Sequence, residues 1–378
     1  MKNPTNHIFE HTPDSLAAWC KERGWAHFRA AQILEWVYKK GVADPMAMTN
    51  LKPAERETLA KEMTILSGDT LAQQAASDGV QKLLIQWSDE MTPSTGGQST
   101  SGTVGASLPV LQPAAASDPS RQTECVMIPS EERNTACISS QVGCPVGCRF
   151  CASGLGGLDG NLTAGRIVEQ VWRLGRLPGV HRITNVVFMG MGEPLSNFAA
   201  VTKAVRTLAA EWATWISARK ITISTVGLPK AIEKLAEELD LPVTLALSLH
   251  APNDQLRREL IPWANYTSID ELLRSCAKWF DKTGREITLE YIMLGGVNDQ
   301  PEHAKQLADV ARTLRANINL IRYNEVAGMP FNRPSTDDVL AFQAVLKSRR
   351  INTHIRASRG RDIAAACGQL RHETAAQK

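Results

Sequence analysis

The chain has 378 residues, eight cysteines and a formal net charge of +3 at pH 7. This length suits one large domain with an accessory domain, and no apolar run approaches the roughly eighteen residues of a membrane span. Eight cysteines are too few for a disulfide scaffold, and the first residues lack the apolar core of a secretory signal. We therefore expect a cytoplasmic protein with reduced thiols.

The first segment, residues 1–70, is predicted to form a small helical accessory domain. Apolar residues recur at helical spacing over 14–65, and Pro45 and Pro53 separate the helices. Residues 71–136 follow as a β-hairpin region, with strand character at 79–87 and 124–129. Between these strands, residues 91–122 are rich in Ser, Thr, Gly, Pro and Ala with almost no charge, which is typical of a flexible insert in a hairpin loop.

Three cysteines with the spacing C-x3-C-x2-C carry most of the information in this chain: Cys144, Cys148 and Cys151. Thiolates are soft ligands that favour iron–sulfur clusters or zinc. A four-iron cluster normally has four cysteine ligands, so three would leave one iron open to a small molecule. The alternative is a structural zinc knuckle, which usually needs a second Cys or His pair. The next histidine, His181, lies outside any such pairing.

Residues 137–370 alternate between strand and helix patterns, which predicts an α/β fold with a parallel sheet, open or closed into a barrel. The predicted strands are 183–189, 220–224, 243–248, 287–292, 317–321 and 353–356. The predicted helices are 162–175, 228–239, 268–282, 301–315 and 336–349. Residues 371–378 are read as a tail. In such folds the functional residues lie in loops after the strands.

Six arginines crowd the C-terminal part of the chain: Arg349, Arg350, Arg356, Arg359, Arg361 and Arg371. Such a cluster suits phosphate binding. A solvated basic face explains it equally well.

Four motifs together resemble the RlmN/Cfr family of radical S-adenosylmethionine enzymes, which methylate a ring carbon of adenine in RNA. They are Cys137-Ile-Ser-Ser-Gln-Val-Gly-Cys144, Gly190-Met-Gly-Glu-Pro-Leu195, Ser248-Leu-His-Ala-Pro-Asn-Asp254 and Arg359-Gly-Arg-Asp-Ile-Ala-Ala-Ala-Cys-Gly-Gln-Leu370. The resemblance implies a partial (β/α) barrel with an N-terminal helical domain and a β-hairpin extension. The insert at 91–122 departs from the compact hairpin of the family.

The resemblance also implies the cofactor sites. The three clustered cysteines would hold one [4Fe–4S] cluster, and S-adenosylmethionine would chelate its open iron. Positions that match the family's S-adenosylmethionine site are Gly192, Glu193, Ser224, Ser248, Leu249, His250 and Asn324. Two molecules of S-adenosylmethionine would be used in each methylation, one as methyl donor and one as radical source.

The chemical roles implied by the resemblance fall on three further residues. Cys367 would carry a methyl group, lose a hydrogen atom from it to a 5′-deoxyadenosyl radical, and form a covalent adduct with the RNA base. Glu124 matches the family's proton acceptor. Cys137 would attack Cys367, forming a transient disulfide that releases methylated RNA, as thiol–disulfide exchange allows. Cys20, Cys125 and Cys276 match no functional position and are read as structural thiols.

Two assignments within the family stay open on sequence. The expected activity is of the RlmN type, at C2 of an adenosine in 23S ribosomal RNA, with transfer RNA as a second candidate. The alternatives are Cfr-type methylation at C8 and a different RNA target. Val142 favours the RlmN type, and Arg322 replaces an expected proline.

A non-catalytic iron–sulfur or zinc protein that binds RNA is the alternative of another class, and it would need no Cys137–Cys367 pair. For the enzyme we expect RNA and an electron donor such as flavodoxin or ferredoxin as partners, no membrane, and a monomer.

Overall fold

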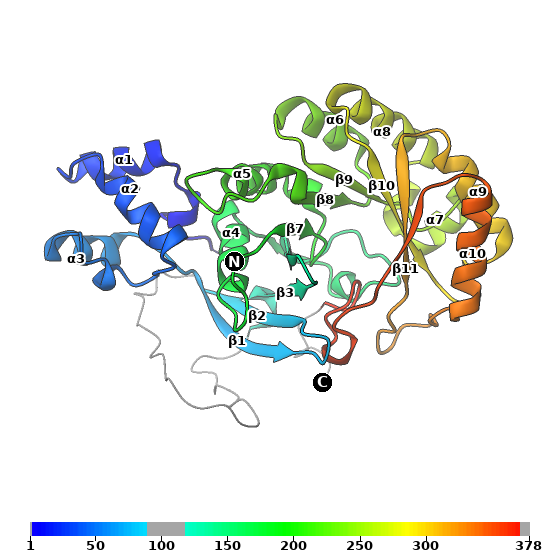
Figure 1. Ribbon diagram of the computed structural model, residues 1–378, viewed down its shortest axis with the longest axis horizontal. Coiled ribbons are helices and arrows are strands. Elements are labelled where there is room, and N and C mark those ends of the chain that lie inside the picture. The colour runs from blue at the N-terminus through cyan, green and yellow to red at the C-terminus, as the bar shows by residue number, and fades with distance from the viewer. Residues whose placement is uncertain (1, 89–117, 371–378) are drawn as a thin grey trace.

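The computed structural model describes residues 2–88 and 118–370, with helices at the N-terminus and a large mixed α/β body (Figure 1). The predicted α/β fold with a helical N-terminal region is confirmed. Residues 91–117 of the predicted insert at 91–122 lie outside the described residues. The whole tail, 371–378, also lies outside them. Within the described ranges no helix is long and apolar enough to cross a membrane.

Three short helices form the N-terminal part: α1 (Pro13–Glu22), α2 (Arg29–Leu34) and α3 (Pro53–Glu62). A π-helical turn, Glu35–Lys39, extends α2. Helix α1 begins where the Thr12 side chain accepts a hydrogen bond from the Ser15 amide, and Pro13 fits the first turn because its missing N–H needs no partner there. Leu16, Ile33 and Leu59 are fully or almost fully buried, so the helices pack on one another through the periodic apolar positions.

Ten strands form one sheet in the order β1-β2-β3-β4-β7-β8-β9-β10-β11-β12. Its antiparallel part contains β1 (Gly68–Ala75), β2 (Gln81–Trp87), β3 (Gln122–Pro129) and β4 (Asn134–Cys137). From β4 onward the neighbours are parallel: β7 (Asn185–Phe188), β8 (Ile221–Thr225), β9 (Thr244–Ser248), β10 (Ile287–Met293), β11 (Ala316–Arg322) and β12 (Thr353–Arg356). A separate ribbon pairs β5 (Gln141–Gly143) with β6 (Leu158–Asn161).

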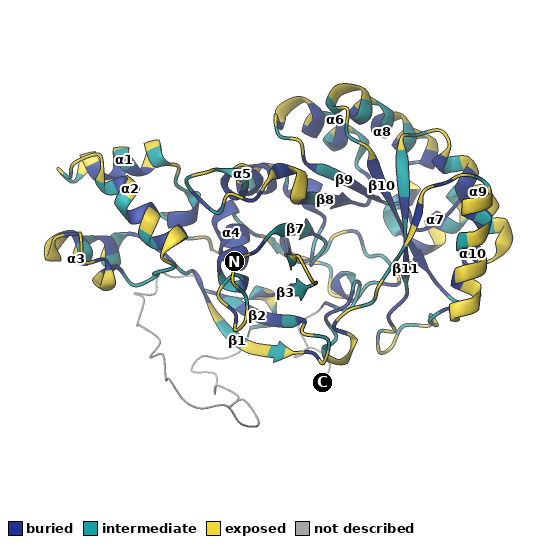
Figure 2. Cartoon of the chain, in the orientation of Figure 1, coloured by how far each residue is buried: buried dark blue, intermediate teal, exposed yellow. Residues whose placement is uncertain are grey.

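Helices lie between the parallel strands in sequence and cover the sheet: α4 (Ala164–Leu174), α5 (Phe198–Ala209), α6 (Pro229–Glu238), α7 (Asp254–Leu260), α8 (Ile269–Thr283), α9 (Pro301–Ala311) and α10 (Thr336–Ser348). Figure 2 shows buried strands inside and helices whose outer surfaces are exposed. Strand β10 is buried at every position, as expected for a strand covered on both faces. Because β4 and β7–β12 are parallel, their carboxyl ends meet at one edge of the sheet.

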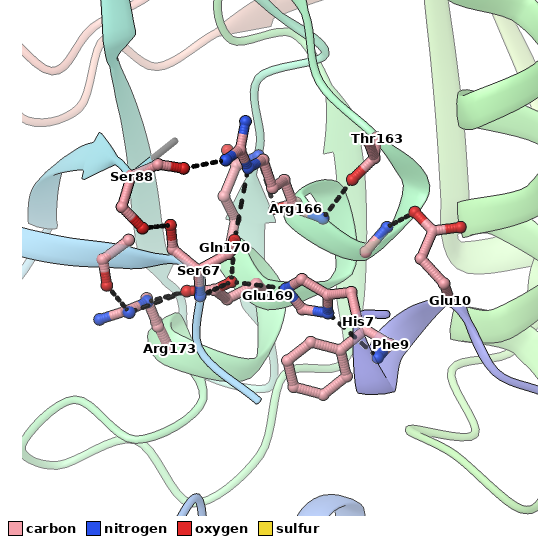
Figure 3. A network of polar contacts seen from close by, with 12 residues as sticks. His7, Phe9, Glu10, Ser67, Ser88, Thr163, Arg166, Glu169, Gln170 and Arg173 are labelled. Atoms are coloured by element: carbon pink, nitrogen blue, oxygen red, sulfur yellow. Dashed lines mark hydrogen bonds and ion pairs between the residues drawn. The ribbon is translucent and has the colours of Figure 1, made fainter. Parts of the chain in front are cut away.

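A buried polar network joins the N-terminal segment to helix α4 (Figure 3). One carboxylate oxygen of Glu169 accepts hydrogen bonds from the Ser67 amide (2.9 Å) and hydroxyl (2.8 Å) and from His7 Nε2 (3.1 Å). The other oxygen accepts from Arg173 Nε at 2.9 Å. Both His7 and Glu169 have fully buried side chains. This network fixes the helical region and the start of β1 against the barrel.

The predicted strands and helices of the barrel region all occur, with bounds shifted by a few residues at most except at the end of α9. Strand β12 has the predicted bounds, whereas α9 ends at Ala311 instead of 315. Within the described residues, six helices and strands were missed: β1, β4, β5, β6, α5 and α7. The missed strands β4–β6 have three or four residues each, too short for a periodic pattern to be seen.

Candidate active site

The cysteine loop begins at the end of β5 and folds back on itself. Gly143, directly before Cys144, has a left-handed backbone with φ of +73°, and a Cβ there would lie 2.0 Å from the Gly157 carbonyl oxygen. Only glycine permits this close approach. The Cys144 amide donates to the same carbonyl at 2.7 Å, and the Cys151 amide donates to the Cys148 carbonyl at 3.1 Å. The loop is therefore held by its own backbone.

The three cysteines of this loop line one cavity, together with residues from the carboxyl ends of the parallel strands. The lining includes Cys144, Cys148, Cys151, Gly192, Glu193, Ser224, Ser248, His250, Glu290, Arg356 and Cys367. We call this the cluster cavity. It brings together residues that are separated by more than two hundred positions in sequence.

The thiol arrangement fits an iron–sulfur cluster better than a single metal ion. Among the described residues, no three His, Cys, Asp or Glu side chains meet closely enough to hold one ion. In a four-iron cluster each thiolate binds its own iron, so the three sulfur atoms need not converge on a point. Cys144, Cys148 and Cys151 would hold such a cluster and leave one of its irons without a cysteine ligand.

Two serines from neighbouring strands meet in the cluster cavity. Ser224 on β8 and Ser248 on β9 have their hydroxyl oxygens 3.2 Å apart. Each hydroxyl can donate and accept, so the pair suits a polar ligand such as a ribose or an amino acid group. The structure thus brings the two predicted serines together in one cavity.

Gly192 and Glu193 connect β7 to the loop after β8. Gly192 has a φ of +105°, and a Cβ there would lie 2.7 Å from both the Gln141 and the Ser140 side chains. The two carboxylate oxygens of Glu193 accept hydrogen bonds from the Leu195 amide (2.9 Å) and the Val226 amide (2.8 Å).

The Glu193 carboxylate holds these two loops together, and burial raises its pKa to about 7 against the effect of those hydrogen bonds. It therefore shapes the cavity, and the backbone of the same segment is left to face a ligand.

His250 lies at the end of β9 in a left-handed conformation, with φ of +59°. Its Nδ1 accepts a hydrogen bond from the Ile292 amide at 3.1 Å, and its ring lies edge-on to Phe150 at 5.1 Å. Burial lowers its pKa to about 3. The ring is therefore neutral, carries its proton on Nε2 and offers one fixed donor in the cluster cavity.

Two of the expected cofactor residues lie elsewhere. The Leu249 side chain is fully buried in the main hydrophobic core, so only its backbone remains available to a ligand. Asn324 lines a neighbouring cavity instead, and its Oδ1 accepts a hydrogen bond from Arg333 at 2.8 Å. The sequence motifs do not show which of the matched side chains line the cluster cavity and which two do not.

Cys367 lines both cavities. The second cavity, which we call the thiol cavity, contains Cys137, Met189, Asn324, Arg356 and Cys367 in its lining. Burial raises the pKa of Cys137 to about 12, and the nearby Cys367 adds to that effect. All eight cysteines are free thiols. The structure thus places Cys367 between the cluster cysteines on one side and Cys137 on the other.

Glu124 lies beside these cavities and is not among their lining residues. It is buried on β3 and forms an ion pair with Lys82, with Lys82 Nζ and Glu124 Oε1 2.8 Å apart. The Ser139 hydroxyl donates to the Glu124 carbonyl at 2.6 Å. Lys82 therefore holds the carboxylate of Glu124, and Ser139 holds its backbone.

Three further residues in or next to this site were not predicted from the sequence: Lys82, Glu290 and Arg356. Glu290 is buried in the cluster cavity and its Oε2 has no hydrogen-bond partner. Arg356 lines both cavities and donates to the Met189 sulfur at 3.2 Å. Arg349, from the same predicted cluster, pairs with Asp309 at 2.8 Å.

Comparisons with known proteins follow the same division of the chain. Residues 138–308 match the model of the radical SAM superfamily, and residues 6–65 match the N-terminal domain of ribosomal RNA large subunit methyltransferases. A probable dual-specificity RNA methyltransferase RlmN of Rhodopirellula baltica is 40% identical over 367 residues, covering 97% of this chain and 91% of the relative.

Two further relatives extend this similarity. A dual-specificity RNA methyltransferase RlmN of Dichelobacter nodosus is 38% identical over 96% of this chain and 93% of its own length. The crystal structure of a radical SAM methyltransferase from Sphaerobacter thermophilus aligns with a TM-score of 0.86 and 38% identity, over 97% of this chain and 99% of that one.

Proposed function

This chain belongs to the RlmN family of radical SAM RNA methyltransferases, and we propose that it methylates C2 of an adenosine in 23S ribosomal RNA, and of an adenosine in transfer RNA, in the cytoplasm. The observation that carries this proposal is the position of Cys367, which lines one cavity with the three cluster cysteines and a second one with Cys137. A protein that only bound RNA would have no use for two thiols in one buried cavity.

In the proposed reaction the cluster supplies, when bound, the electron that cleaves S-adenosylmethionine reductively. The two serine hydroxyls, the His250 Nε2–H and the backbone around Gly192 hold S-adenosylmethionine in the cluster cavity. Two molecules of it are consumed in each methylation. A soluble donor such as flavodoxin or ferredoxin provides electrons, and the enzyme acts as a monomer.

Cys367 relays the methyl group. Its sulfur first accepts a methyl, a 5′-deoxyadenosyl radical then removes one hydrogen atom from that methyl, and the resulting carbon radical bonds to the adenine ring. When this adduct loses its ring proton it also gives up one electron, which returns to the redox centre of the enzyme. Glu124 removes the ring proton: the C–H bond breaks and an O–H bond forms on the carboxylate. Cys137 attacks the Cys367 sulfur, so an S–S bond forms, the C–S bond breaks, and its electron pair goes to the carbon, which takes up a proton to become a methyl group.

Trapping the covalent adduct tests this sequence of steps. In a Cys137→Ala variant loaded anaerobically with iron and sulfide, RNA should stay bound to Cys367 through denaturing electrophoresis. Cys125→Ala is the matched control, because Cys125 is also a buried thiol near β4 but packs into the main core. Recovery of only free protein from Cys137→Ala would contradict the role given to Cys137.

The position of the new methyl group distinguishes C2 from C8. Digestion of the modified RNA followed by mass spectrometry and nuclear magnetic resonance identifies the methylated carbon directly. A methyl group at C8 would assign the chain the Cfr type of activity, and methylation of neither RNA would point to a different substrate.

A further inference from the structure

Lys82 and Glu124 form a buried ion pair across two antiparallel strands. Lys82 lies opposite Val126 and Leu84 lies opposite Glu124, so the charged side chains are diagonal neighbours on one face of the sheet. Their N–O distance is 2.8 Å, and each side chain is only 3% exposed. A buried ammonium and a buried carboxylate at this distance are costly to separate.

The face that carries this pair also borders the thiol cavity. Side chains alternate along β3, so Glu124, Val126 and Ile128 share one face. Ile128 lines the thiol cavity, and Val126 packs in one apolar cluster with Cys137 and Ala365. Glu124 therefore lies on the side of β3 where Cys137 and Cys367 meet.

Lys82 also reaches the loop that carries Cys367. Its Nζ lies 3.4 Å from the Ala364 carbonyl oxygen, three residues before Cys367. Ala364 has a left-handed backbone, with φ of +49°, which is strained for a residue with a side chain. The lysine thus touches both the carboxylate of Glu124 and a strained turn next to Cys367.

The turn between β1 and β2 holds the same loop by two further hydrogen bonds. The Gly360 amide donates to Asp78 at 3.0 Å, and the Ser77 amide donates to Asp362 at 2.9 Å. Figure 1 shows the C-terminal loop, in red, beside the tip of this hairpin. These contacts hold the loop in place without Lys82. Anchoring of the loop therefore does not by itself explain why the Lys82 ammonium is buried beside it.

A carboxylate that is to accept a proton must be ionised before the reaction, and removal from water disfavours the ionised form. The adjacent ammonium offsets that cost. When Glu124 takes up a proton its charge disappears, while Lys82 keeps its contact with the Ala364 carbonyl. No bond to Lys82 is made or broken.

We infer that Lys82 is a positioning residue for the second half of the reaction: it holds Glu124 ionised and oriented toward the substrate proton and aligns it with the Cys367 loop. This inference rests on the proposed function, because it takes Glu124 as the proton acceptor. A purely structural lysine would instead support the methylation of Cys367 and the later RNA steps equally.

Separate measurement of the two half-reactions tests the inference. In Lys82→Met, methylation of Cys367, followed by peptide mass spectrometry, should stay within about twofold of wild type, while RNA methylation should fall about 100-fold, the usual contribution of a general base. Lys82→Arg keeps the charge and should recover at least about tenfold of that loss. Asp362→Asn, which weakens only the loop contact, is the matched control and should affect neither half-reaction selectively.

The double variant Lys82→Met/Glu124→Gln provides the second measurement. If Lys82 acts through Glu124, this variant should methylate RNA no more slowly than Glu124→Gln alone. The inference is overturned if the two losses multiply, if Lys82→Met loses both half-reactions equally, or if Lys82→Arg recovers nothing.

A folding defect leaves the test intact. If Lys82→Met does not fold, Lys82→Met/Glu124→Leu, which buries neither charge, replaces it. That variant should still methylate Cys367 and fail on RNA, and loss of Cys367 methylation in the folded double variant would overturn the inference. The proposed function is tested separately, with the wild-type protein. It fails if the wild-type protein methylates no RNA.

Discussion

The Ala152 amide donates a 2.8 Å hydrogen bond to the carbonyl oxygen of Gly368, which joins the cysteine loop directly to the loop that carries Cys367. A second bond runs beside it, from the Ser153 hydroxyl to the Leu370 carbonyl at 2.7 Å. The loop with Cys144, Cys148 and Cys151 and the loop with Cys367 are therefore held together by neighbouring backbone segments. Movement of one loop will displace the other.

Ser153→Ala tests this connection. The variant should keep its full iron content, because no cysteine ligand is changed, but methylation of Cys367 should slow by about fivefold, as expected for the loss of one buried hydrogen bond worth about 1 kcal/mol. Iron analysis and peptide mass spectrometry measure the two properties. Ser348→Ala, at an exposed helix end, should change neither. Loss of iron from Ser153→Ala would show that the serine supports the cluster loop itself.

Gly192→Ala should strongly weaken S-adenosylmethionine binding in the reconstituted enzyme. The added Cβ would lie 2.7 Å from the Gln141 and Ser140 side chains, at a φ of +105° that disfavours any side chain. We expect at least about a tenfold rise in Kd by calorimetry, equal to about 1.4 kcal/mol. Gly156→Ala, where a Cβ would meet nothing within 4 Å, is the control. An equal Kd for S-adenosylmethionine in both variants would show that Gly192 is not part of the binding site.

His250 should not titrate between pH 5 and 8. Because its pKa in the folded protein is about 3, below the ordinary value of 6.5, the unfolded chain binds the proton more readily. The contribution of His250 to the free energy of unfolding is therefore fully present above pH 6.5 and is lost as the pH falls toward 3. Histidine carbon resonances, with His250→Gln to assign the signal, measure the titration. A midpoint near pH 6.5 would contradict a buried, neutral ring.

Glu169 should contribute to stability in a different pH range. Burial alone would raise its pKa, but Arg173, His7 and the Ser67 amide outweigh burial and lower the pKa to about 2, from 4.5. The stabilisation, about 3 kcal/mol, is fully present above pH 4.5 and is lost as the pH falls toward 2.

Urea unfolding of Glu169→Gln at several pH values measures this contribution. The variant should be less stable than wild type at pH 7, and the difference should shrink below pH 4.5. Glu302→Gln, which removes an exposed ion pair with Lys305, is the control and should leave stability nearly unchanged at every pH. A difference between Glu169→Gln and wild type that does not depend on pH would show that packing, not charge, is lost.

The barrel could be predicted from sequence because its longer strands and helices have clear patterns, as in β10 and α8. The site was predictable where residues lie next to each other, as in the cysteine loop and the pair Gly192 and Glu193. The contact between Lys82 and Glu124 was not, because it depends on the register of β2 against β3 across a long connection. The side-chain direction of Leu249 likewise depends on tertiary packing.

The network around Glu169 limits how this protein can be recombined with its relatives. Its donors come from the N-terminal segment, from the start of β1 and from helix α4 itself. A chimaera that exchanges the helical region at residue 65 would keep Ser67 and Arg173 but replace His7. Because a buried carboxylate without a full set of partners is costly, such an exchange succeeds only when the donated segment brings a hydrogen-bond donor to the same place. The two parts of the chain are therefore one structural unit, and an exchange of either part has to preserve the partners of Glu169.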